Sequence, residues 1–163
     1  MPTTASALAT VSDPQEGMRV DVTTGTGFRL TFDTADAGDQ RAGPGPTESV
    51  LALLAGCASM DVRSILRKKR QRATGYRISV TGERTEAHPQ VYTAIVVEHQ
   101  VSGEVEPEAL RRAIELSATA YCPVNAMLSR GVRIEHRYLL SRPGQDDAGA
   151  RVAITGPEGP RVL

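Results

Sequence analysis

One long apolar stretch constrains the fold more than any other part of the sequence. Between residues 47 and 70, apolar side chains recur at steps of three and four, the spacing of one helical face. Pro46 stands just before the stretch, where a missing N–H costs nothing, and the basic run 67–70 suits the negative end of a helix dipole. The sequence therefore predicts a long helix over 47–70. Its repeating apolar positions are Leu51, Leu54, Ala55, Ala58, Val62, Ile65 and Leu66.

Shorter patterns lie on either side of this helix. Pro107 begins a second predicted helix that runs to about Ala120, and Pro123 begins a short third helix that Gly131 ends. Alternating apolar and polar residues predict strands, and turn residues at 25–27 join the first two into a hairpin. The predicted strands cover 18–22, 28–33, 76–84, 91–101 and 132–140.

The order of these elements indicates the fold class. Strands and helices come in groups, as in α+β proteins, rather than alternating as in a parallel βαβ sheet. We expect one domain over residues 1–163, with a loose N-terminus over 1–17 and a C-terminal extension over 141–163, where only 151–155 resembles a strand. The long helix is apolar on several sides, which favours a homodimer with this helix near the shared core.

Composition and charge argue against several function classes. Lys plus Arg equals Asp plus Glu, at 19 each, and only 4% of residues are aromatic, which argues against nucleic acid as a partner. The basic run at 67–70 then fits a solvated helix end better than a phosphate site. We find no apolar run that approaches the roughly 20 residues needed to span a bilayer. Residues 1–14 lack the pattern of a secretory signal. We therefore expect a cytoplasmic protein that does not bind a membrane.

The two cysteines carry the chemistry that the sequence suggests. Cys57 lies in the middle of the long helix among Ala55, Gly56 and Ala58. Small neighbours let a ligand or another backbone approach the sulfur. Gly56 indicates close packing there, because glycine inside a helix costs up to about 1 kcal/mol relative to alanine. Residue types alone leave open whether Cys57 is reactive or a buried small apolar side chain.

Cys122 precedes Pro123 at a predicted helix start. Unpaired N–H groups and the helix dipole at that place favour thiolate over thiol. A two-cysteine peroxidase needs two thiols and a cation or hydrogen-bond donor that holds the first sulfur as thiolate. One thiolate attacks the distal peroxide oxygen and becomes a sulfenic acid, the second closes a disulfide, and a dithiol reopens it.

Other polar residues are interpreted as structural. Asp61 follows Cys57 by one helical turn, and we favour a structural role for it. His88, His99 and His136 show none of the spacings that bind metals, so we take them as strand or surface residues and expect no metal.

Two segments around the cysteines resemble one known family. Residues 45–62, Gly-Pro-Thr-Glu-Ser-Val-Leu-Ala-Leu-Leu-Ala-Gly-Cys-Ala-Ser-Met-Asp-Val, are similar to the helix that opens the OsmC/Ohr motif. Residues 117–128, Ser-Ala-Thr-Ala-Tyr-Cys-Pro-Val-Asn-Ala-Met-Leu, are similar to the second cysteine segment, in the OsmC-like branch with Tyr-Cys-Pro-Val. The resemblance covers roughly residues 18–140, and the two motifs together are specific.

The resemblance implies a fold and an activity. The family fold is an intertwined α+β homodimer, with antiparallel sheets wrapped around the cysteine helices and active sites at the subunit interface. By resemblance, Cys57 is the peroxidatic and Cys122 the resolving cysteine of a thiol-dependent peroxidase that reduces organic hydroperoxides in oxidative or osmotic stress. The resemblance implies no bound cofactor, because the reductant is an external dithiol such as the lipoyl group of a partner protein.

Two further positions depart from the family pattern. Well characterised members carry Glu directly after the Pro that begins the helix, whereas here Thr47 occupies that place and Glu48 follows. They also carry an Arg in an N-terminal Gly-Gly-Arg loop, which this sequence lacks; Arg41, just before the helix, is the candidate partner of a Cys57 thiolate. The alternatives are therefore a non-catalytic stress protein that keeps the fold and a redox switch that uses the cysteine pair.

Overall fold

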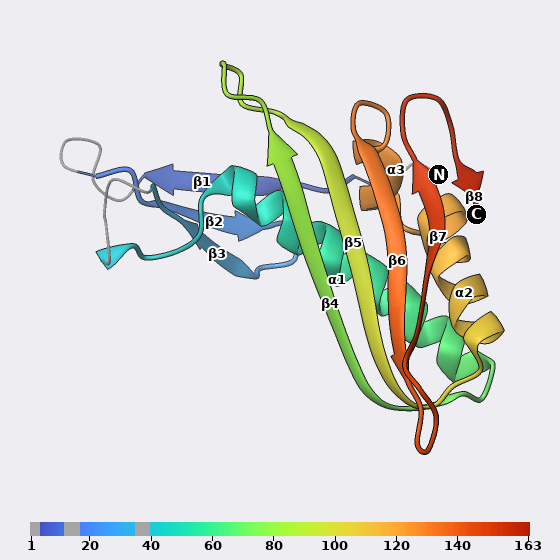
Figure 1. Ribbon diagram of the computed structural model, residues 1–163. Coiled ribbons are helices and arrows are strands. Elements are labelled where there is room, and N and C mark those ends of the chain that lie inside the picture. The colour runs from blue at the N-terminus through green and yellow to red at the C-terminus, as the bar shows by residue number, and fades with distance from the viewer. Residues whose placement is uncertain (1–3, 12–16, 35–39) are drawn as a thin grey trace. The chain divides into compact units, whose positions relative to one another are not determined.

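The computed structural model describes residues 4–11, 17–34 and 40–163. The chain divides into two compact units, Met1–Val50 and Leu51–Leu163. The first unit holds an antiparallel sheet of order β1-β2-β3 (Figure 1), in which β2 and β3 form the predicted hairpin with Val20 opposite Phe32. The three strands are β1 (Ala7–Val11), β2 (Val20–Thr24) and β3 (Arg29–Phe32).

Strand β1 corrects one expectation. It lies inside the segment that we expected to be loose, and it pairs along β2 from Ala7 opposite Thr24 to Val11 opposite Val20. All five of its residues are exposed, so backbone hydrogen bonds rather than buried side chains hold it. A strand without buried side chains shows no apolar alternation in its sequence, so the pattern does not reveal it. Part of the 1–17 segment lies outside the described residues.

Helix α1 (Pro46–Lys68) confirms the strongest prediction from the sequence. Glu48 lies in its first turn, and Arg67 and Lys68 lie in its last turn, as the helix dipole favours. By length and composition alone, α1 is long and apolar enough to cross a membrane. The prediction that no apolar run approaches the length of a membrane span is therefore wrong. Within the second unit one side of α1 packs into the core through Leu54, Ala58, Val62 and Leu66, as in a core helix.

The second unit is a five-stranded sheet of order β4-β5-β6-β7-β8. Five of the expected elements appear here: the two long strands, the second helix, the short third helix and the strand after it. Strands β5 and β6 run parallel, in contrast to the expected antiparallel sheet, because helices carry the chain back between them. The elements are β4 (Arg72–Arg84), β5 (Tyr92–Glu104), α2 (Pro107–Leu116), the π-helical turn η2 (Ser117–Tyr121), α3 (Pro123–Leu128), β6 (Arg133–Ser141), β7 (Ala148–Thr155) and β8 (Arg161–Val162).

The C-terminal extension joins this sheet. β7 pairs antiparallel with β6, and β8 pairs with β7. The sequence indicated only 151–155 as a strand, yet β7 begins at Ala148 and its Val152 and Ala153 are fully buried. The small residues Ala148, Gly149 and Ala150 give no alternating pattern, which is why the start of β7 was missed.

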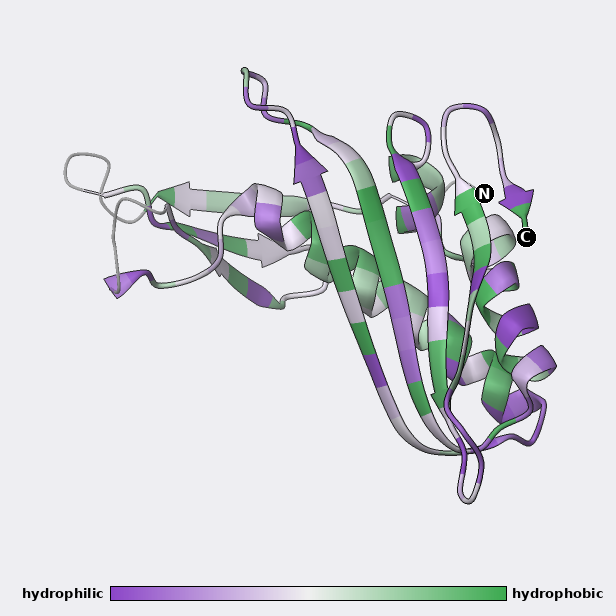
Figure 2. Cartoon of the chain, viewed as in Figure 1, coloured by the Kyte–Doolittle hydropathy of each residue, from purple (hydrophilic) through white to green (hydrophobic). Residues whose placement is uncertain are grey.

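Helices α1 and α2 cover the same face of the five-stranded sheet (Figure 1). Hydropathy follows blocks along β5 and β6 (Figure 2), whereas burial alternates residue by residue along β5, and the inward positions of the sheet fill two buried clusters. The larger cluster joins α1, α2 and the sheet around Val62, Leu110 and Val101. The smaller one contains Leu54, Ile95, Val97, Cys122 and Ile134, so the second cysteine belongs to the apolar core.

Candidate active site

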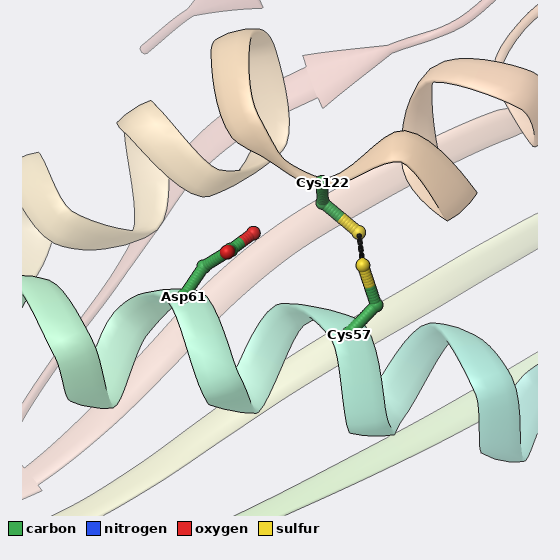
Figure 3. A group of neighbouring side chains, drawn as sticks. All are labelled: Cys57, Asp61 and Cys122. Atoms are coloured by element: carbon green, nitrogen blue, oxygen red, sulfur yellow. Dashed lines mark hydrogen bonds between the residues drawn. The ribbon is translucent and has the colours of Figure 1, made fainter. Parts of the chain in front are cut away.

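The two cysteines lie in direct contact (Figure 3). Cys57 projects from the middle of α1, and Cys122 projects from the segment that begins α3. The Cys122 thiol donates a hydrogen bond to Cys57 Sγ, with 2.7 Å between the sulfurs. Both are free thiols in this structure. A disulfide of about 2.05 Å therefore requires only a short further approach.

Backbone geometry at the start of α3 positions Cys122. Helix α2 ends at Leu116, and the chain continues through η2 into an extended Cys122, which serves as the N-cap of α3. The Asn125 N–H donates to Cys122 Sγ over 3.4 Å. The predicted helix start is therefore confirmed, and Pro123 supplies its first residue.

The expected preference for thiolate at Cys122 is wrong. Only 3% of Cys122 is exposed, and this burial, followed by the hydrogen bond to Cys57, raises the pKa of the Cys122 thiol to about 12. The Asn125 N–H lowers this pKa, as a helix start should, but its effect is smaller than that of burial. Cys122 is therefore held as a thiol, while Cys57 is the more accessible of the two sulfurs.

Asp61 joins the cysteine pair. Its carboxylate lies one turn along α1 from Cys57, and one of its oxygens and the two sulfurs all lie within 4.8 Å of one another. The Ser117 hydroxyl donates to Asp61 Oδ2 over 3.2 Å, which ties α1 to η2 beside the cysteines. Cys57, Asp61 and Cys122 are the described group with the spacing of metal ligands, but three side chains that include the protonated Cys122 fall short of the four ligands of a structural Zn²⁺ site. The expectation of no metal stays a prediction.

Buried polar side chains support the segment that carries Cys122. The Asn125 amide, 1% exposed, donates from Nδ2 to Ala118 O over 2.7 Å and to Thr155 Oγ1 over 3.2 Å. His136 Nε2 donates to Asn125 Oδ1 over 2.9 Å. Asn125 therefore fastens η2 and α3 to β6 and β7 directly behind the buried cysteine.

His99 and His136 are buried strand residues, which corrects the surface alternative for them. His99 Nδ1 pairs with the Tyr76 hydroxyl over 2.7 Å, and the two imidazole rings stack with centroids 6.0 Å apart. Burial lowers the pKa of His136 to about 4, and burial together with the neighbouring His136 lowers that of His99 to about 3. Both rings are therefore neutral near pH 7. No sequence motif marks this network, because each histidine occupies an ordinary inward position of a strand.

The remaining candidates belong to the first unit or to open surface. Glu48 and Arg41 are exposed residues of Met1–Val50, so their roles stay predictions. Arg41, together with Arg19, contributes to a lowered Asp33 pKa, for which backbone N–H donors from Ala42 and Thr34 are the main cause. A Cβ built at Gly56 meets nothing within 4 Å among the described residues, so the close packing expected there is not made within this chain.

A separate hollow lies away from the cysteines in the second unit. It encloses about 530 Å³ and is lined by Arg63, Arg67, Gln71 and Tyr76 among others, but by neither cysteine. We place the chemistry at the sulfurs, because contact between two thiols is a more specific observation than an open hollow.

Comparison with known proteins identifies the family. The family model described as "OsmC-like protein" matches residues 37–137, a span that contains both cysteines. The chain belongs to the OsmC family. It is 36% identical to Protein YhfA of Escherichia coli K12 over 124 residues, which cover 76% of this chain and 90% of that protein.

Solved structures agree with the family and the fold. A hypothetical protein from Aquifex aeolicus VF5 superposes with a TM-score of 0.75 and 27% identity, over 86% of this chain and 98% of that one. The organic hydroperoxide resistance protein OhrB of Bacillus subtilis superposes with a TM-score of 0.57 and 16% identity, over 86% of this chain and 98% of that one. The α+β OsmC fold and the membership of the OsmC/Ohr family, both expected from the sequence, are confirmed.

Proposed function

We propose that this OsmC-family protein is a cytoplasmic, thiol-dependent peroxidase that reduces organic hydroperoxides, a role in oxidative or osmotic stress defence. The observation that carries the proposal is the contact between the two sulfurs, which joins residues 65 positions apart in the sequence. OhrB of Bacillus subtilis, which shares the fold, is named for organic hydroperoxide resistance. That name supports the reaction type, and the geometry supports the assignment of roles.

The difference in exposure between the two cysteines supports an order of steps. Cys57, the more accessible sulfur, attacks the distal oxygen of ROOH, releases ROH and becomes a sulfenic acid. Cys122 then attacks the Cys57 sulfur, water leaves, and a disulfide forms. An external dithiol, such as the lipoyl group of a partner protein, reduces the disulfide. Glu48 and Arg41 are proposed to orient and stabilise the Cys57 thiolate.

The surroundings of Cys57 favour an organic peroxide. Leu51, Leu54, Val124 and Leu128 belong to the same apolar cluster as the two cysteines. An apolar wall binds the alkyl group of a hydroperoxide, which hydrogen peroxide lacks. No metal or bound cofactor takes part in the proposed reaction.

A homodimer with active sites at the interface is part of the proposal. One side of α1 leaves large apolar side chains in solvent, with Leu53 59% and Met60 74% exposed. Tyr121 and Met127, on either side of Cys122 in sequence, are also exposed. A second copy that covers this surface would bury it and enclose the cysteine pair. Light scattering should give twice the 17.4 kDa chain mass, and a monomer at micromolar concentration would contradict this part.

Peroxide consumption tests the function. Purified protein receives cumene hydroperoxide, or hydrogen peroxide for comparison, with dihydrolipoamide as reductant. We expect many turnovers, a preference for the organic peroxide and no turnover in Cys57→Ser. If the cysteines are oxidised once but no dithiol supports turnover, the protein is a redox switch rather than an enzyme. If peroxide does not react at all, the protein is a non-catalytic stress protein.

A further inference from the structure

The proposed reaction needs a group that carries one proton from Cys122 to the departing hydroxide. When Cys122 attacks the oxidised Cys57, its thiol must lose a proton, yet burial and the hydrogen bond to Cys57 raise the pKa of that thiol to about 12. Water has little access to the Cys122 side chain, because only 3% of it is exposed. A nearby base would remove this obstacle.

Asp61 is the carboxylate placed to act as that base. Figure 3 shows its side chain rising from α1 toward the segment that carries Cys122. One carboxylate oxygen lies within 4.8 Å of both sulfurs, a distance that one bridging water or a small rotation closes. The Ser117 hydroxyl holds the carboxylate in this orientation from the other side of the gap.

The other groups around Cys122 are less suitable acceptors. Cys57 is the partner of the reaction, and the Asn125 N–H is a donor. His136, on β6, lies behind the Asn125 amide and already uses Nε2 to donate to it. Among the described residues that influence Cys122, Asp61 is thus the anionic group that can take a proton.

We infer that Asp61 is a catalytic base that accepts the Cys122 proton as the disulfide with Cys57 closes. This inference deepens the proposed function and rests on it for the peroxide step. Cys122 sulfur forms the S–S bond, and the S–O bond of the Cys57 sulfenic acid breaks with its electron pair. The departing hydroxide takes the proton from Asp61 and leaves as water. Cys122 is oxidised, the Cys57 sulfur is reduced, and the carboxylate is regenerated.

The test separates the two cysteine steps. Reduced protein receives one equivalent of cumene hydroperoxide. Trapping with dimedone follows the sulfenic acid, and loss of free thiols follows the disulfide. In Asp61→Asn we expect sulfenic acid at close to the wild-type rate, but disulfide closure slowed about a hundredfold or more, with a rate that rises steeply with pH. Asp61→Glu should recover part of the rate, and Glu83→Gln, which neutralises an exposed carboxylate of β4, should match wild type.

A second measurement needs no peroxide. The chromogenic dithionitrobenzoate reagent forms a mixed disulfide with Cys57 and releases one coloured thiolate; attack by Cys122 then releases a second. Only the second release should slow in Asp61→Asn, and it should vanish in Cys122→Ser. Second release and disulfide closure at wild-type rates in Asp61→Asn would overturn the inference. Absence of trapped sulfenic acid in Cys122→Ser, with a slowed second release in Asp61→Asn, would instead contradict the proposed function and keep Asp61 as the base. Thermal melting confirms that each variant is folded.

Discussion

Cys57 and Cys122 carry the same side chain in two very different regions. Cys57 lies on a regular, partly exposed turn of α1, next to the open surface at Gly56. Cys122 lies at an irregular junction between η2 and α3, inside the apolar core and in front of a buried amide. One region leaves its sulfur partly accessible to solvent, and the other keeps its sulfur buried and protonated. The difference shows that reactivity follows the surroundings of a thiol and not its presence.

The largest expected effect is a difference in alkylation between the two cysteines. With iodoacetamide at pH 7.5, we expect Cys122 in the folded, reduced protein to react at least about a hundredfold more slowly than Cys57. Its burial and its pKa of about 12 leave little thiolate. Peptide mapping by mass spectrometry measures each rate, and the guanidinium-unfolded chain serves as control because both sites should then react alike. Equal alkylation rates of Cys57 and Cys122 in the folded protein would contradict the difference between their surroundings.

A smaller effect is expected from removal of the support behind Cys122. Asn125→Ala leaves His136 Nε2 and Ala118 O without their buried partner, so the free energy of unfolding should fall by about 2–4 kcal/mol. Alkylation of Cys122 should also become faster. Urea denaturation measures the first effect, with Ser129→Ala, at the half-buried C-cap of α3, as a control that changes stability by less than about 0.5 kcal/mol. If both variants unfold alike, Asn125 does not fasten this region.

The third effect is gradual, because it is a dependence of stability on acid that builds up over a range of pH. His99 and His136 have folded pKa values of about 3 and about 4, below the ordinary value of 6.5, so the unfolded chain binds more protons between those limits. The stability that the neutral rings contribute is present above pH 6.5 and is lost as pH falls toward 4. Each ring should contribute a slope of up to about 1.4 kcal/mol per pH unit near pH 5. Urea denaturation from pH 7 to pH 4.5 measures it.

The exposed His88 supplies the matched control for that titration. His88→Gln should leave the acid slope unchanged, because no burial separates this side chain from water. His136→Gln should reduce the slope, since it removes one of the two titrating groups. A flat profile for the wild-type protein between pH 6.5 and pH 4.5 would contradict the assignment of both rings as buried and neutral.

Periodic patterns in the sequence predicted most helices and strands of the second unit. The spacing of Leu54, Ala58 and Val62 predicted α1, and Pro123 marked the start of α3, because local geometry ties these signals to the chain itself. The sequence patterns did not predict β1 or the start of β7, Ala148–Ala150. The exposed residues of β1 and the small residues of β7 have no apolar alternation, and only pairing with a neighbouring strand makes them strands.

The sequence by itself determined the helices, most strands, the family and the two candidate thiols, since these depend on residue order. Tertiary structure decided what the thiols can do. It brought Cys122 onto Cys57 across 65 positions and buried it deeply enough to reverse the expected effect of a helix start on its pKa. It also placed Asp61 beside both sulfurs. Burial and through-space contacts depend on segments that are distant in the sequence, so no local pattern encodes them.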